Sequence, residues 1–143
     1  MSGWATRKRW YDETDDCVAH INARGDIDFV MHGGDISDFG MSREFEWIHQ
    51  RMRRLDVPYV ALIGNHDILG NGVYVYEAMY GKLNFSFIAG PTKFVCLNTN
   101  ALEFDYSEPV PDFEFILNEA QKQDGYENTV IAMHSGPYNE QFN

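Results

Sequence analysis

The sequence predicts an α/β fold with mixed sheets flanked by helices. Segments with apolar residues at helical spacing alternate along the chain with short apolar runs that suit buried strands. The chain has 143 residues, of which 44% are hydrophobic and 15% aromatic, so it can bury the core of one ordinary domain. It contains no repeat, low-complexity tract or linker-like stretch, and we therefore expect residues 1–143 to form a single domain.

The first half of the chain predicts two helices and two buried strands. A helix is expected over residues 12–24, which begin with acidic residues and are followed by a glycine. A strand over 27–32 passes into a pair of glycines. The next helix, over 41–55, can be capped by Ser42 and has basic residues near its end, as the helix dipole favours. A second strand over 58–63 should run parallel to the first, because a helix joins the two.

The second half predicts a short helix, a hairpin, a longer helix and a final strand. A glycine and a proline separate the two apolar runs of the hairpin, and another proline lies near the start of the longer helix. These elements are expected over residues 73–80, 84–89 with 93–97, 110–123 and 129–134.

The acidic composition excludes some partners. Asp and Glu number 22 against 11 Lys and Arg, which gives a net charge of −11. Nucleic acids and anionic membranes are held mainly by clustered Lys and Arg, so we expect neither as a partner. No apolar run approaches the roughly 20 residues of a membrane span. Residues 1–10 do not resemble a secretory signal, so the cytoplasm is the default location. A signal encoded further upstream would not be visible in this sequence, and the location is therefore left open. The two cysteines, Cys17 and Cys96, are expected to be buried hydrophobes.

Polar residues of the kinds that bind metals follow three of the predicted strands. Asp35 follows the first strand, and Asn65, His66 and Asp67 follow the second. His134 ends the last strand. Sites in open sheets form beyond the carboxyl ends of strands, so these residues should lie close together. A carboxylate, an amide oxygen and an imidazole suit manganese, iron, zinc or nickel better than calcium or a thiolate-bound zinc.

These motifs resemble those of the calcineurin-like metallophosphoesterases. The matching segments are residues 28–38, which contain Gly-Asp, 60–67, which end in Gly-Asn-His-Asp, and 130–134. The resemblance runs from about Tyr11 to the end of the chain. It implies part of a four-layer αββα sandwich and the metal-dependent hydrolysis of a phosphate monoester or diester at a centre with two divalent ions.

The resemblance also implies a role for each residue. Asp35 would bridge the two metal ions, and Asn65 and His134 would bind the second ion. His66 would contact the phosphate and protonate the leaving oxygen, while Asp67 would orient the His66 ring. A hydroxide held by the metals would attack phosphorus, and both ions would stabilise the displacement.

Two motifs of that family are missing. None of the five histidines has an aspartate two places before it, as the opening Asp-x-His motif requires, and the closing Gly-His-x-His motif is also absent. We therefore expect an incomplete domain, in which exposed sheet edges favour self-association. Two functions stay open. The intact parent protein is a metal-dependent phosphoesterase, or the domain is a catalytically inactive binding or scaffolding module.

Several other residues allow two interpretations. His32 either supports the site or is a core histidine, and Asp38 is expected in a loop or helix cap rather than as a ligand. Asn98 and Asn100 are expected to be turn residues. A group of aromatic residues either lines a substrate cleft or, as we expect, covers the sheet: Tyr74, Tyr76, Tyr80, Phe85 and Phe87.

Overall fold

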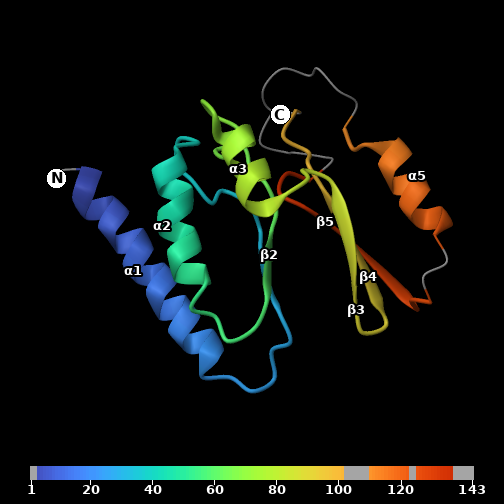
Figure 1. The fold of residues 1–143 in the computed structure, drawn as a ribbon, viewed down its shortest axis with the longest axis horizontal. Coiled ribbons are helices and arrows are strands. Elements are labelled where there is room, and N and C mark those ends of the chain that lie inside the picture. The colour runs from blue at the N-terminus through green and yellow to red at the C-terminus, as the bar shows by residue number, and fades with distance from the viewer. Residues whose placement is uncertain (1–2, 102–109, 123–124, 137–143) are drawn as a thin grey trace.

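Two sheets lie between outer helices in the computed structural model, which describes residues 3–101, 110–122 and 125–136 (Figure 1). Helices α1 and α2 form one outer layer, α3 packs beside α2, and α5 lies on the opposite side (Figure 1). The helices are α1 Gly3–Asn22, α2 Ser42–Met52, α3 Gly72–Tyr80 and α5 Phe113–Gln121. The strands are β1 Val30–His32, β2 Tyr59–Ala61, β3 Phe85–Ala89, β4 Thr92–Leu97 and β5 Asn128–Met133. This arrangement confirms the predicted α/β class and its four layers.

The first sheet pairs β1 with β2 in parallel, with Val30 beside Tyr59 and His32 beside Ala61. The parallel pairing across α2 confirms the prediction. Both strands are shorter than expected, because the ladder stops at Pro58. The Pro58 carbonyl accepts a hydrogen bond from the Val30 N–H at 2.9 Å, but proline has no N–H to extend the ladder further.

The second sheet has the strand order β3-β4-β5. The predicted hairpin is confirmed, since β3 and β4 are antiparallel and join at Gly90, whose φ is 57°. Strand β5 runs parallel to β4, with Leu97 beside Met133. His134 therefore comes directly after Met133, the last residue of β5.

The helix ends differ from the sequence predictions. Helix α1 starts well before residue 12, because no glycine or proline interrupts the chain from Trp4 to Asn22. The prediction that Ser42 caps α2 is wrong, since Met41 is the cap residue. Helix α5 begins late, because the Asp112 side chain accepts the Phe115 N–H at 2.9 Å and so caps the helix there.

Aromatic residues join the layers. Phe29, just before β1, packs edge-on against the rings of Phe87 in β3 and Phe94 in β4, with centroids 5.5 and 5.3 Å away. Tyr76 is fully buried over the first sheet, and its hydroxyl donates to the Ala61 carbonyl at 2.6 Å. Tyr76 thus covers the sheet as expected, but Tyr74 is 75% exposed and does not. Cys96 is buried as predicted, whereas Cys17 is exposed on α1, and that part of the prediction is wrong.

The outer edge of the second sheet carries apolar side chains. Among the described residues β5 pairs with β4 on one side only, so its other side is an edge of the sheet. Val130 and Ile131 of this strand are 43% and 48% exposed. Exposed apolar edge strands are templates for pairing with another chain. None of the described helices is both long and apolar enough to cross a bilayer.

We predict that Ile131→Lys reduces self-association of the chain, because a charge on β5 opposes edge-to-edge pairing. Sedimentation velocity over a range of protein concentrations measures the effect. Tyr74→Lys is the control, since it adds the same charge to an exposed aromatic residue on α3. A wild-type chain that stays monomeric, or equal association of both variants, would contradict the prediction.

Candidate metal centre

A buried carboxylate ties together the loops that follow β1 and β2. Asp67 is fully buried, and its Oδ2 accepts the Ile36 N–H at 3.1 Å and the Gly64 N–H at 2.9 Å. Its Oδ1 accepts the Ser37 N–H at 2.7 Å and the Ser37 hydroxyl at 2.9 Å. Hydrogen bonds to a buried charge are among the stronger ones in proteins. The two loops are therefore held in one fixed arrangement.

Glycines let these loops approach the end of β5. Gly34 has a φ of 101°, and a Cβ at this position would lie 2.5 Å from the His134 Nδ1. A Cβ at Gly64 would collide with the backbone nitrogen and Oδ1 of Asp35. Asp35 itself has a positive φ of 55°, which is uncommon for a residue with a side chain. The glycines of both motifs are thus needed for close contact between the loops.

Three side chains converge between the two sheets. His134 Nε2 lies 3.1 Å from the Asn65 Oδ1 and 3.4 Å from the Asp35 Oδ1. His134 Nδ1 lies 2.7 Å from the Gly33 carbonyl oxygen. Because a carbonyl can only accept, Nδ1 carries the proton, and in the neutral ring the lone pair of Nε2 faces two oxygens. The sequence predicted this convergence of Asp35, Asn65 and His134.

This donor set suits one divalent cation. A carboxylate oxygen and an amide oxygen both lie within 3.4 Å of the imidazole nitrogen, and all three atoms are electron-pair donors that a cation would satisfy. The bond from Nδ1 to the Gly33 carbonyl also orients the ring, as is usual for histidines that bind metals. The described residues contain no group of three or more His, Cys, Asp or Glu side chains that could hold a metal ion, so the Asn65 amide is needed to complete the set.

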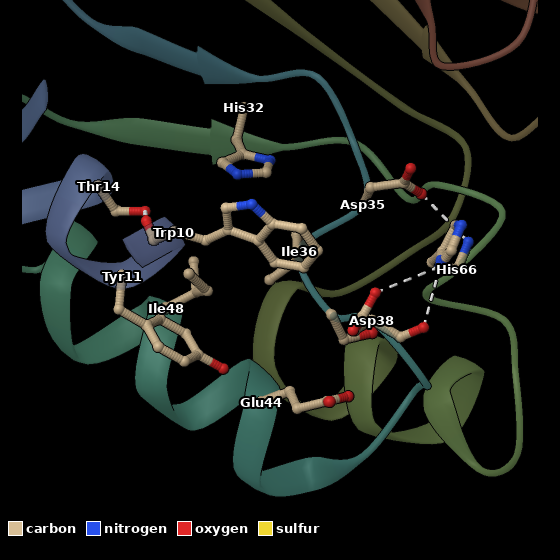
Figure 2. A pocket seen from close by; sticks show the side chains of 11 residues that line it. Trp10, Tyr11, Thr14, His32, Asp35, Ile36, Asp38, Glu44, Ile48 and His66 are labelled. Atoms are coloured by element: carbon tan, nitrogen blue, oxygen red, sulfur yellow. Dashed lines mark hydrogen bonds and ion pairs between the residues drawn. The ribbon is translucent and has the colours of Figure 1, made fainter. Parts of the chain in front are cut away.

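His66 lies beside this group on the loop after β2. Its backbone N–H donates to the Asp35 Oδ1 at 3.1 Å. Its ring is 46% exposed, and its Nδ1 lies 2.9 Å from the Asp38 carbonyl oxygen and 3.8 Å from the Asp38 Oδ1 (Figure 2). The bond to the Asp38 carbonyl, together with the nearby carboxylates, raises the pKa of His66 above its ordinary value. Nε2 is left as the ring atom that can exchange a proton with a ligand.

The predicted role of Asp67 differs from its place in the structure. Both Asp67 oxygens accept hydrogen bonds from the loop backbone and from Ser37, as described above. The His66 ring is held instead by the backbone carbonyl of Asp38, a residue expected to serve in a loop or cap. Sequence reasoning missed this partner because a backbone carbonyl has no residue-type signature.

A cavity of about 370 Å³ opens beside His66 and Asp35 (Figure 2). Trp10 and Tyr11 of α1 form its apolar wall, and Glu44 lies at the start of α2 below them (Figure 2). His32 lines the same cavity, and burial lowers its pKa below the ordinary value. Asp35 and His66 therefore face a space that is large enough for a small ligand.

Polar residues after β4 hold the second sheet against the first. Asn100 is fully buried and donates to the Ile63 carbonyl at 3.1 Å and to the Asn98 Oδ1 at 2.8 Å. Thr99 is also buried, and its hydroxyl donates to the Ser135 carbonyl at 2.8 Å. The expectation that Asn98 and Asn100 are simple turn residues is incomplete, because these bonds fix the place of His134 relative to β2.

We predict that Asp67→Asn lowers the free energy of unfolding by about 3 kcal/mol, because an amide NH₂ group would face backbone donors that need an acceptor. Urea unfolding measures the change. Asp26→Asn is the control, since this exposed carboxylate pairs with Arg24 on the surface, where solvent screens the pair, and its loss should leave the free energy of unfolding nearly unchanged. Equal stability of the two variants would show that Asp67 does not hold the loops together.

Two comparisons with known proteins identify the family of the chain. A stretch of 52 residues is 38% identical to a protein of Arcobacter nitrofigilis named "Probable glycerophosphodiester phosphodiesterase GpdQ". The stretch covers 36% of this chain and 19% of that protein, so the match spans a small part of the relative's length. Residues 7–143 match the family model for calcineurin-like phosphoesterases. Because this match covers nearly the whole chain, the chain belongs to the calcineurin-like phosphoesterase family, a family of metal-dependent phosphoester hydrolases.

Proposed function

We propose that Asp35, Asn65 and His134 bind a divalent cation and that the protein uses this centre to hydrolyse a phosphate ester. The observation that carries the proposal is that the Asn65 Oδ1 and the Asp35 Oδ1 lie 3.1 and 3.4 Å from the His134 Nε2. The acidic chain, with a net charge of −11, gives a further reason. A phosphate group would be repelled from this site unless a cation were bound there.

The side chains around the centre would divide the work of hydrolysis. A bound divalent ion supplies Lewis-acid charge to the phosphate oxygens. Asp35, Asn65 and His134 hold that ion in place. His66 donates a proton from Nε2 to the leaving oxygen, and the upward shift of its pKa favours the protonated ring that this role needs. The Asp38 carbonyl keeps the other ring proton on Nδ1.

The number and identity of the ions are finer proposals. Asp35, Asn65 and His134 would serve one ion, and a second ion would be bridged by the other oxygen of Asp35. The mixed oxygen and nitrogen ligands favour manganese, iron, zinc or nickel. We choose manganese as the probe, because it accepts carboxylate and amide oxygens readily.

We propose phosphodiesters as the substrate class. The support is the relative from Arcobacter nitrofigilis, whose name describes a glycerophosphodiester phosphodiesterase. The alternative is an inactive binding domain, which is favoured because the described residues contain no group of three or more His, Cys, Asp or Glu that could hold a metal ion. Binding and turnover must therefore be measured separately.

We predict that the chain binds one Mn²⁺ ion and that Asp35→Asn weakens the affinity by roughly tenfold or more, because removal of even an indirect metal contact costs that much. Isothermal titration calorimetry measures the stoichiometry and the dissociation constant. Asp26→Asn removes the same charge far from the centre and should leave the affinity unchanged. Equal affinity in the two variants would refute the role of Asp35, and two tightly bound ions would show ligands beyond these three.

We predict that any Mn²⁺-dependent hydrolysis of bis(p-nitrophenyl) phosphate falls by about 10²–10⁴-fold in His66→Asn, because the leaving oxygen loses its general acid. The release of p-nitrophenol is followed by absorbance, and a chelator should abolish it. His20→Asn is the control, since His20 is an exposed histidine of α1. Unchanged turnover in His66→Asn would overturn the acid role, and metal binding without turnover in the wild type would favour the inactive domain.

A further inference from the structure

We propose that Glu44 is a positioning residue that orients the His66 ring through a single peptide group of the loop between β1 and α2. The inference rests on the proposed role of His66. Glu44 lies in the first turn of α2 and is 5% exposed, which is unusual for a carboxylate that forms no salt bridge within the described part of the chain. Its Oε2 accepts the Phe39 N–H at 2.9 Å and the Met41 N–H at 3.3 Å.

The bond to Met41 is an ordinary helix cap, but the bond to Phe39 is not. Met41 is the cap residue of α2, and a glutamate three places later commonly reaches back to it. Phe39 lies two residues before the cap, in the loop itself. Helix capping therefore does not account for this second, shorter bond.

The Phe39 N–H and the Asp38 carbonyl belong to the same peptide group. In a trans peptide the N–H and the C=O point in opposite directions. When Glu44 accepts the N–H on one side, the carbonyl must face the other side, where it lies 2.9 Å from the His66 Nδ1. The carboxylate also polarises the amide, which makes the carbonyl a stronger acceptor. Glu44 thus sets both the direction and the strength of the contact to His66.

The backbone and side chain of Ser37, just before Asp38, are held by other bonds. Ser37 donates its N–H and its hydroxyl to the Asp67 Oδ1, and the Gly40 N–H donates to the Ser37 Oγ at 3.1 Å. Two buried carboxylates, Asp67 and Glu44, therefore fix the backbone before and after Asp38. With Glu44 absent, the Asp38–Phe39 peptide can rotate and present its N–H to His66. An N–H requires an acceptor at Nδ1, so the ring proton would move to Nε2.

The test is the tautomer of the neutral His66 ring in the ¹⁵N-labelled chain, read from long-range proton–nitrogen correlations at a pH where the histidines are neutral. We expect the proton on Nδ1 in the wild type. Glu44→Gln should keep this pattern, because the amide oxygen can still accept from Phe39. Glu44→Leu should lose it, with a larger share of the proton on Nε2.

Three controls separate positioning from general damage. Glu46→Leu removes an exposed glutamate of the same helix and should leave the His66 tautomer unchanged. Asp38→Asn removes the carboxylate near His66 but keeps the carbonyl, and should also leave it unchanged. His134, whose Nδ1 proton is held by the Gly33 carbonyl, reports whether the site stays folded in each variant.

If Glu44→Leu fails to fold, Glu44→Asp takes its place, because it keeps the charge but withdraws the oxygen by one methylene. The Nδ1 pattern should then weaken relative to Glu44→Gln. An unchanged His66 tautomer in a folded Leu or Asp variant would overturn the proposal. The measurement needs neither metal nor turnover. If Glu44→Leu changes the His66 tautomer but the wild-type chain does not hydrolyse esters, the proposed function is refuted and the positioning role of Glu44 stands.

Discussion

The buried carboxylate of Asp67 is the constraint on which the candidate centre depends. Its two oxygens accept hydrogen bonds from the loop after β1 and from the loop after β2, at Ile36, Ser37 and Gly64. A buried charge is stable when its surroundings supply such donors, so the loops and the carboxylate hold one another. This arrangement places Asp35 and Asn65 on one side of the seam between the sheets. It also fixes the first half of the loop that carries the Asp38 carbonyl to His66.

The second sheet completes the centre from across the seam. Asn100 and Thr99 tie the ends of β4 and β5 to the first sheet, and His134 then reaches the Gly33 carbonyl with one ring nitrogen and the oxygens of Asn65 and Asp35 with the other. The glycines at 34 and 64 leave the space that this contact needs. The electrostatic result is a group of electron-pair donors in an acidic chain, which is an arrangement that attracts a cation.

Much of this could be predicted from the sequence. The alternation of helical and apolar segments predicted the layers, and the strand-end positions of Asp35, Asn65 and His134 predicted their convergence, because parallel strands end at one edge. The roles of Asp38, Asn100 and Glu44 could not be predicted, since they depend on backbone carbonyls and on a single peptide plane. The resemblance implied a role for Asp67 at the His66 ring, whereas its oxygens accept hydrogen bonds from the backbone of Ile36 and Ser37 on another loop, which residue types do not reveal. Side-chain types show what chemistry is available, but backbone geometry decides which groups meet.

The central claim is that Asp35, Asn65 and His134 together form a cation site. The most direct test is an anomalous difference map at the manganese absorption edge, from crystals of the chain grown with Mn²⁺. Our account predicts a peak that touches the Asp35 Oδ1, the Asn65 Oδ1 and the His134 Nε2, with the His134 Nδ1 still bound to the Gly33 carbonyl. A manganese peak held by other side chains, or no peak at these atoms at saturating Mn²⁺, would contradict it.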